Sequence, residues 1–292
     1  MSSALPEDSV YIINKPPGPT SFAQVASLRR LLGIKKAGHA GTLDPEASGI
    51  LIVLTGQATR AAKFFEGLDK EYLAVIKLGI TTDTYDLSGQ VLSTSDVPVF
   101  SRAEIEKALS NFQGHIMQVP PAFSAIKKDG QPLYKAARQG IEVELVPRPV
   151  EIQRIDLKSI DLPEITISVK CSKGTYIRSL AFDLGKKLGC GAALAKLVRT
   201  AVGEFTLDRA VPGNSGRAEF ESGAVSIDQA LYFLDALELS PEQVQRIGHG
   251  NPVEYPHPDS GQIKARYQGQ ILALGRIQDN IFKPQTVLAA QC

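Results

Sequence analysis

The stretch Gly38–Gly49, with the sequence GHAGTLDPEASG, runs directly into the apolar segment Ile50–Leu54 (ILIVL). A compact apolar run rich in β-branched residues predicts a buried strand. The glycines permit backbone conformations that are closed to other residues, and Asp44-Pro45 places a carboxylate where the chain must bend. The residues alone leave two interpretations of Asp44. It is either the N-cap of a short helix that begins at Pro45 and ends at Gly49, or a functional carboxylate in a loop.

The composition is that of a folded globular chain. Its 292 residues are 43% hydrophobic and 22% charged, which is enough for one large domain and a small one. The apolar runs are far shorter than the roughly 20 residues of a bilayer span, and no signal-peptide pattern opens the chain. We therefore expect a cytoplasmic protein. The three cysteines include no C-x-x-C pair and are expected to be free thiols.

The net charge of +1 conceals a segregation of charge along the chain. The window 171–200 contains six basic residues and one acidic residue, whereas 204–245 contains eight acidic residues and two basic ones. Such asymmetry indicates either a nucleic-acid-binding face or two solvated helix faces.

Periodicity and capping signals predict most of the secondary structure. Helices are expected from Ser21 to Gly33, at 102–112 behind a Ser101–Glu104 capping box, at 177–188, at 191–199, from Ser226 to Leu237 behind a second capping box, and from Ser240 to Gly248. Strands are expected at Tyr11–Asn14, 50–54, 70–79 and 165–171, with short β-type runs after Asn251. Helices and strands interleave without regular βαβ spacing, so the predicted fold class is α+β with a small all-β module at the C-terminus.

Two further segments could carry chemistry. Asp83–Gly89 (DTYDLSG) has two carboxylates, but its spacing lacks the ligand alternation of a calcium loop and favours a turn over a metal site. Lys173–Ser179 (KGTYIRS) joins a predicted strand to a predicted helix. Its side chains suit RNA, because bases stack on tyrosine and phosphates pair with lysine and arginine; an ordinary strand–helix junction is the alternative.

Three motifs in this order, 38–45 (GHAGTLDP), 69–72 (DKEY) and 172–178 (SKGTYIR), resemble the TruB family of bacterial tRNA pseudouridine-55 synthases. The resemblance extends to 14–18 (NKPPG) and 134–140 (YKAARQG), and so covers most of the chain. It implies isomerisation of uridine to pseudouridine at position 55 in the T-loop of tRNA, by base flipping and an aspartate nucleophile, with no cofactor and no metal.

The resemblance also implies roles for individual residues. The implied catalytic residues are Asp44 as nucleophile, Tyr72 as the ring that stacks on the target base, and Arg178 as the cation that pairs with the nucleophile. The implied substrate-binding residues are His39, Lys15, Tyr176, Leu197, Lys173, Arg199 and Arg138. Of these, His39 takes the place that the flipped uridine vacates, and the basic residues of 120–150 and 171–200 hold phosphates of the T-arm.

The family's fold implies a mixed, mainly antiparallel β-sheet with flanking helices as a catalytic domain at 1–240, with an RNA-binding insertion at about 120–150. A small all-β PUA-like module is expected at 245–292. The implied partner is the T-arm of tRNA, with no membrane and no obligate protein partner, and the protein is expected to be a monomer. A tRNA-binding folding chaperone, in which modification is incidental, is the alternative function.

Overall fold

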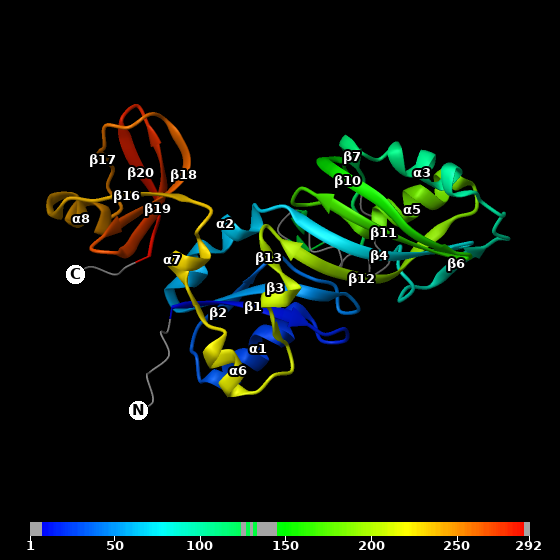
Figure 1. The fold of residues 1–292 in the computed structure, drawn as a ribbon, viewed down its shortest axis with the longest axis horizontal. Helices are drawn as coiled ribbons and strands as arrows, with labels where there is room; N and C mark the ends of the chain where they lie inside the picture. The colour runs from blue at the N-terminus through cyan, green and yellow to red at the C-terminus, as the bar shows by residue number, and fades with distance from the viewer. Residues whose placement is uncertain (1–7, 124–126, 129–130, 133–144, 289–292) are drawn as a thin grey trace. The chain divides into compact units, whose positions relative to one another are not determined.

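The computed structural model describes residues 8–123, 127–128, 131–132 and 145–288 (Figure 1). Contacts divide the chain into two compact units: Met1–Asp44, Ile50–Glu66 and Asp208–Cys292 form the first, and Pro45–Gly49 and Gly67–Leu207 form the second. Arg138 and most of the predicted insertion lie outside the described residues. No helix in the described part of the chain is long and apolar enough to span a membrane.

The second unit is built on an antiparallel sheet with the strand order β12-β4-β11-β10-β7, seen side by side in Figure 1. These strands are β4 (Lys70–Leu78), β7 (Gly114–Gln118), β10 (Arg148–Asp161), β11 (Glu164–Cys171) and β12 (Ala192–Val202). Along β11, the buried Ile165, Ile167 and Val169 alternate with partly exposed residues, so one face of the sheet packs on the core. Helices α3 (Arg102–Ser110) and α5 (Ile177–Leu188) contact each other, and they also contact β10 and β12 respectively.

The prediction of a helix at 191–199 is wrong, because these residues lie in β12. Alanine, leucine, lysine and arginine are strong helix formers. The segment nevertheless pairs with β4 from Ala192 to Val202, and its side chains are mostly buried. Burial within the sheet therefore outweighs local propensity here.

The first unit opens with β1 (Ser9–Lys15) and α1 (Ser21–Leu32). β1 lies next to β3 (Ser48–Thr55), which also pairs with β2 (Ala37–Ala40). The predicted helix boundaries of α1 are confirmed: the Thr20 side chain caps its start, and Gly33 ends it in the left-handed conformation.

The remaining elements are short, and several of them pair with the strands already described or with each other. They are η1 (Gly56–Ala61), α2 (Ala62–Glu66), β5 (Ile80–Thr82), β6 (Val91–Thr94), β8 (Lys127–Lys128), β9 (Gln131–Pro132), β13 (Phe205–Thr206), η2 (Leu207–Arg209), β14 (Val211–Pro212), α6 (Arg217–Ser222), β15 (Val225–Ser226) and α7 (Ile227–Ala230).

The C-terminal residues form the predicted all-β module, which fits a PUA-like domain. Its sheet has the order β16-β18-β19-β20-β17. The elements are β16 (Asp235–Glu238), α8 (Pro241–Gly248), β17 (Val253–Glu254), β18 (Ser260–Tyr267), β19 (Gln270–Gln278) and β20 (Ile281–Val287). Its core includes Leu237 and Leu239, so the packed module extends upstream of residue 245. The predicted fold class, α+β with a mainly antiparallel sheet and a small all-β module, is confirmed.

The helix predicted to run from Ser226 to Leu237 is only one turn long. Its capping box is present, with Ser226 and Gln229 bonded reciprocally, but α7 ends at Ala230 and the chain becomes strand β16 at Asp235. Residues 235–238 pair with β18 and complete the sheet of the module, which accounts for the early end of the helix.

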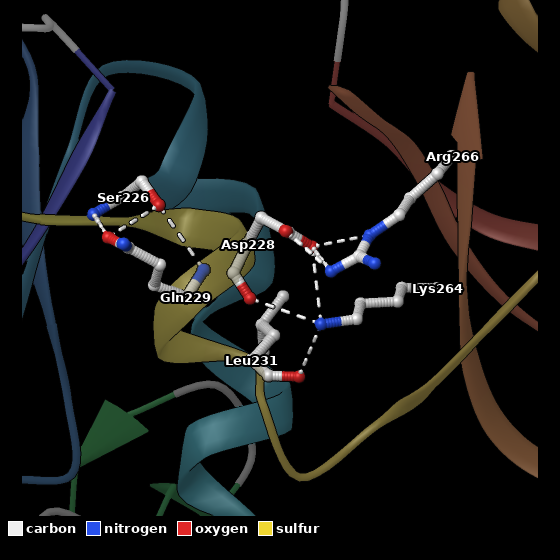
Figure 2. Close-up of polar contacts among 6 residues, drawn as sticks. All are labelled: Ser226, Asp228, Gln229, Leu231, Lys264 and Arg266. Carbon is white, nitrogen blue, oxygen red and sulfur yellow. Dashed lines mark hydrogen bonds and ion pairs between the residues drawn. The ribbon is translucent and has the colours of Figure 1, made fainter. Parts of the chain in front are cut away.

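A cluster of charged groups joins α7 to β18 (Figure 2). The amine of the buried Lys264 donates to the carbonyl oxygens of Asp228 and Leu231, each at 3.1 Å, and lies 3.2 Å from Oδ1 of Asp228. Arg266 donates to the same carboxylate from Nε at 2.9 Å and from Nη2 at 2.5 and 2.6 Å. Burial raises the pKa of Asp228, but hydrogen bonds and charges from Arg266 and Lys264 outweigh that effect and lower the pKa. An ionised Asp228 therefore holds β18 to α7.

We expect Asp228→Asn to lower the free energy of unfolding by about 1–3 kcal/mol at pH 7, because two cations lose their charged acceptor. Since the pKa of Asp228 is lower in the folded state than in the unfolded state, its contribution is complete above the unfolded pKa and is lost as the pH falls through the folded pKa. Urea unfolding at pH 7 and at about pH 3 measures this difference, which should shrink in acid.

The matched control for this measurement is Asp235→Asn, since Asp235 is an exposed carboxylate on β16. That variant should unfold within about 0.5 kcal/mol of the wild type. An equal loss in both variants, or a difference that grows in acid, would show that the Asp228 cluster does not stabilise the fold.

Candidate active site

Asp44 lies in the loop between β2 and β3. The chain turns at Pro45-Glu46 and β3 begins at Ser48, so no helix starts at Pro45 and the helix-capping interpretation of Asp44 is wrong. Asp44 is partly exposed, whereas the nearby Leu43 and Ala47 are 4% and 3% exposed. Their burial anchors the loop on both sides of Asp44.

Each end of this loop is held through the main chain. At its start, Oγ of Ser21 accepts a hydrogen bond from the Leu43 N–H at 2.8 Å and donates one to the Leu43 carbonyl at 3.0 Å. At its end, Gly49 has a φ of 105° and pairs in parallel with Arg199 of β12. A Cβ on Gly49 would lie 2.2 Å from the Arg199 carbonyl oxygen, so only glycine fits there.

Arg178, in the first turn of α5, is bound by acceptors that come from other segments of the second unit. Its side chain is buried; Nη1 donates to the Thr84 carbonyl at 3.1 Å and Nη2 to the Phe123 carbonyl at 3.0 Å. Its Nε lies 3.7 Å from Oδ2 of Asp86. A rigid guanidinium with partners on several sides has a fixed orientation.

Asp86, one of the two carboxylates of Asp83–Gly89, is a candidate functional residue through a contact that the sequence does not predict. The prediction that Asp83–Gly89 forms a turn is confirmed: Oδ1 of Asp86 accepts bonds from the Thr84 hydroxyl at 2.8 Å and the Ser88 N–H at 3.0 Å. The same carboxylate forms the ion pair with Arg178. These partners are far apart in the sequence, so no local signal reveals their contact.

Tyr176 occupies the N-cap position of α5, and Gln118 from the end of β7 bonds its main chain on both sides. The Tyr176 N–H donates to Oε1 of Gln118 at 2.8 Å, and Nε2 of Gln118 donates to the Tyr176 carbonyl at 3.0 Å. Lys173 is exposed in the turn just before this position. The strand–helix junction predicted here is therefore present, with Tyr176 partly exposed.

The strands of the second unit carry three further predicted site residues. Tyr72 on β4 is partly exposed and lies in register with Val169 of β11 and Arg199 of β12. Leu197 and Arg199 of β12 are 9% and 2% exposed. The guanidinium of Arg199 therefore lies in the interior and not on a surface that could contact phosphates.

The first unit carries the other two. Lys15, at the end of β1, is fully buried, and its amine donates to the carbonyl oxygens of Pro16 at 2.8 Å and Pro19 at 2.9 Å. These bonds stiffen the proline-rich loop. His39 is partly exposed on β2, opposite Val53 of β3.

The predicted site residues thus divide between the two units. The first unit contains Lys15, His39 and Asp44, and the second contains Tyr72, Lys173, Tyr176, Arg178, Leu197 and Arg199. Within the described ranges, no three or more His, Cys, Asp or Glu side chains gather in a way that could hold a metal ion.

Gly49→Ala is expected to lower the free energy of unfolding by about 2–5 kcal/mol, because it adds a Cβ against the Arg199 backbone at a positive φ. Thermal and urea unfolding measure the loss. The control is Gly38→Ala in the same motif, where a Cβ has no heavy atom of the described chain within 4 Å. That variant should change the stability by less than about 1 kcal/mol, and similar losses in both would refute the close-approach argument.

Comparison with known proteins gives matches over nearly the whole chain. Residues 29–177 match the TruB family pseudouridylate synthase (N terminal domain), and residues 178–214 match the tRNA pseudouridylate synthase B C-terminal domain. The tRNA pseudouridine synthase B of Azoarcus sp. (strain BH72) is 42% identical over 291 residues, which cover 97% of this chain and 96% of that protein. The protein of the same name from Opitutus terrae (strain DSM 11246 / JCM 15787 / PB90-1) is 50% identical over 200 residues, covering 68% of this chain and 83% of that one.

A solved structure shares the fold. A crystal structure of a Cbf5-Nop10-Gar1 complex aligns with a TM-score of 0.74 and 24% identity, over 97% of this chain and 86% of that chain. At this identity the likeness shows the architecture alone. Identity near 40% over almost the full length, together with the two adjoining domain matches, shows that the chain belongs to the TruB family of pseudouridylate synthases.

Proposed function

We propose that this pseudouridine synthase acts on the uridine at position 55 in the T-loop of tRNA, with Asp44 as its nucleophile. The observation that carries the proposal is the setting of Asp44: a partly exposed carboxylate between buried Leu43 and Ala47, in a stretch that matches the family. The isomerisation breaks the N1–C1′ and C5–H bonds and forms the C5–C1′ and N1–H bonds, with no redox change and no net hydrolysis. One well-placed carboxylate is therefore a sufficient nucleophile.

A uridine in a folded T-loop must leave its stack before it can react, at a cost of a few kcal/mol. In the proposed mechanism His39 fills the space that the base vacates and Tyr72 stacks on the extruded base. Lys15, Tyr176 and Leu197 are proposed to line its pocket. Stacking on an aromatic ring offsets part of the cost of flipping.

Arg178 is proposed to supply the positive charge that keeps the nucleophilic carboxylate ionised. Its carbonyl partners and its ion pair with Asp86 support this role, because they hold a buried cation in one orientation. We propose that Asp86 positions Arg178 and does not itself contact the substrate.

Asp44→Asn is expected to reduce pseudouridine formation about 10⁴-fold or more, because an amide keeps the shape of the side chain but is not a nucleophile. The assay is conversion of an unmodified tRNA transcript without added metal or cofactor, mapped to the nucleotide. The Kd for the same tRNA, measured by filter retention, should stay within about twofold of the wild-type value. The nucleophile acts in the chemical step, so its loss has little effect on ground-state binding.

The control variant is Glu46→Gln, which alters an exposed carboxylate in the same turn and should keep full activity. Substantial turnover by Asp44→Asn would disprove the nucleophile assignment. Product at a nucleotide other than 55 would disprove the target site. Tight tRNA binding by a wild-type protein that makes no pseudouridine would favour the folding-chaperone alternative.

We further propose that the exposed basic residues of the window 171–200 bind tRNA. Arg178 and Arg199 are buried. The four basic residues that reach solvent are Lys173, Lys186, Lys187 and Lys196. Phosphate contacts by these lysines, with help from the PUA-like module, account for docking of the T-arm on a monomeric enzyme.

Lys173→Ala is expected to weaken tRNA binding and to reduce the slope of log K against log salt by about one, as the loss of one phosphate contact requires. Binding titrations from low to moderate salt measure the slope. Lys158→Ala is the control, because Lys158 is exposed on β10 and its amine lies 3.6 Å from Oδ2 of Asp156. An unchanged slope for Lys173→Ala, or an equal change in the control, would remove Lys173 from the binding surface.

A further inference from the structure

Ser21 makes two hydrogen bonds to the residue that precedes Asp44. Its hydroxyl accepts from the Leu43 N–H at 2.8 Å and donates to the Leu43 carbonyl at 3.0 Å, and both bonds are buried. A serine hydroxyl has one proton and two lone pairs, so it can serve as donor and acceptor at once. The two bonds join positions 22 residues apart in the sequence.

Ser21 is held firmly by the helix that it begins. It is the first residue of α1, whose Val25, Leu28 and Leu32 are buried in the core. Capping of the helix does not depend on it, because Oγ1 of Thr20 accepts the N–H of Ala23 at 3.0 Å. The Ser21 hydroxyl is thereby available for the tertiary contact, and it transfers the rigidity of α1 to Leu43.

The main-chain geometry of Leu43 determines where the next residue projects its side chain. The main-chain N–H and the main-chain carbonyl of Leu43 both form hydrogen bonds with Ser21. Neither peptide group beside Leu43 can therefore rotate without breaking a buried bond. Loss of the hydroxyl would leave a buried N–H and a buried carbonyl to find new partners, which displaces the backbone. A misplacement of about 1 Å at a reacting group can cost 10²-fold in rate.

We infer that Ser21 is a positioning residue that sets the direction of the Asp44 carboxylate toward the reacting base. It acts through the Leu43 main chain and does not touch substrate. The inference rests on the proposed role of Asp44 as nucleophile. Ser21 lies outside the sequence motif at 38–45 that contains Asp44. It belongs to α1, whereas the motif comprises part of β2 and the loop that follows it.

The test compares Ser21→Ala with Thr20→Ala. Thr20→Ala removes a side-chain bond to the same helix, at an expected stability cost of about 1 kcal/mol, but leaves the Leu43 contact intact. Ser21→Ala should slow the single-turnover formation of pseudouridine about 10- to 100-fold while the Kd for tRNA stays within about twofold. Thr20→Ala should lower the melting temperature and keep the single-turnover rate within about twofold.

Two results would overturn the inference. A folded Ser21→Ala protein with a wild-type single-turnover rate would show that the clamp, meaning the two hydrogen bonds between Ser21 and Leu43, has no part in the reaction. An equal rate loss in Thr20→Ala would show that any weakening of α1 slows the enzyme, and that the Leu43 bonds are not the cause.

Amide hydrogen exchange of the wild-type protein tests the clamp even if Ser21→Ala fails to fold. The Leu43 N–H should exchange slowly, since its bond to Ser21 is buried. Exchange as fast as that of an exposed loop amide would refute the inference. This readout is independent of activity, so failure of the clamp is distinguishable from failure of the nucleophile assignment, which the Asp44→Asn assay decides.

Discussion

The backbone of β3 meets that of β12 at Gly49 more closely than any side chain permits, since a Cβ there would lie 2.2 Å from the Arg199 carbonyl oxygen. This approach sets the register in which Ser48 and Gly49 pair with Val198 and Arg199. Because β3 begins here, the end of the Asp44 loop is determined by main-chain packing. Its start is held by the Ser21 hydroxyl, which bonds the main-chain N–H and carbonyl of Leu43. A short loop held at both ends leaves Asp44 little conformational freedom, which suits the role proposed for it.

Local signals were sufficient where a residue interacts with near neighbours in the sequence. The capping box of Ser101 and Glu104 marks the start of α3, and Ser240-Pro241 marks that of α8. The same signal at Ser226 predicted the start of α7 but not its end, because pairing of Asp235–Glu238 with β18 depends on residues further along the chain. The failure at β12 has the same origin: helix-forming side chains are held as a strand by the neighbouring strands.

The site shows the same division. Asp44 stands out in the sequence through its motif. Whether it caps a helix or lies in a loop is decided only by the structure, which shows a turn and no helix at Pro45-Glu46. The contacts of Asp86 with Arg178 and of Ser21 with Leu43 have no local signal, because only the fold brings these residues together. Burial also decides whether a basic residue contributes to the charge of the protein surface. Arg199 is counted among the basic residues of its window, yet it lies in the interior and contributes nothing to the basic surface.

The contact between Gln118 and Tyr176 makes the start of α5 depend on a distant part of the chain. The N-cap residue of α5 is Tyr176, and tyrosine is not among the side chains that cap helices well. Its main chain is bonded instead by the side-chain amide of Gln118, which lies 58 positions earlier in the chain. An isolated segment spanning this helix would fray at its first turn, where Arg178 lies. The boundary of the helix therefore depends on the contact with β7, so the first turn that carries Arg178 is stabilised by tertiary structure rather than by local capping.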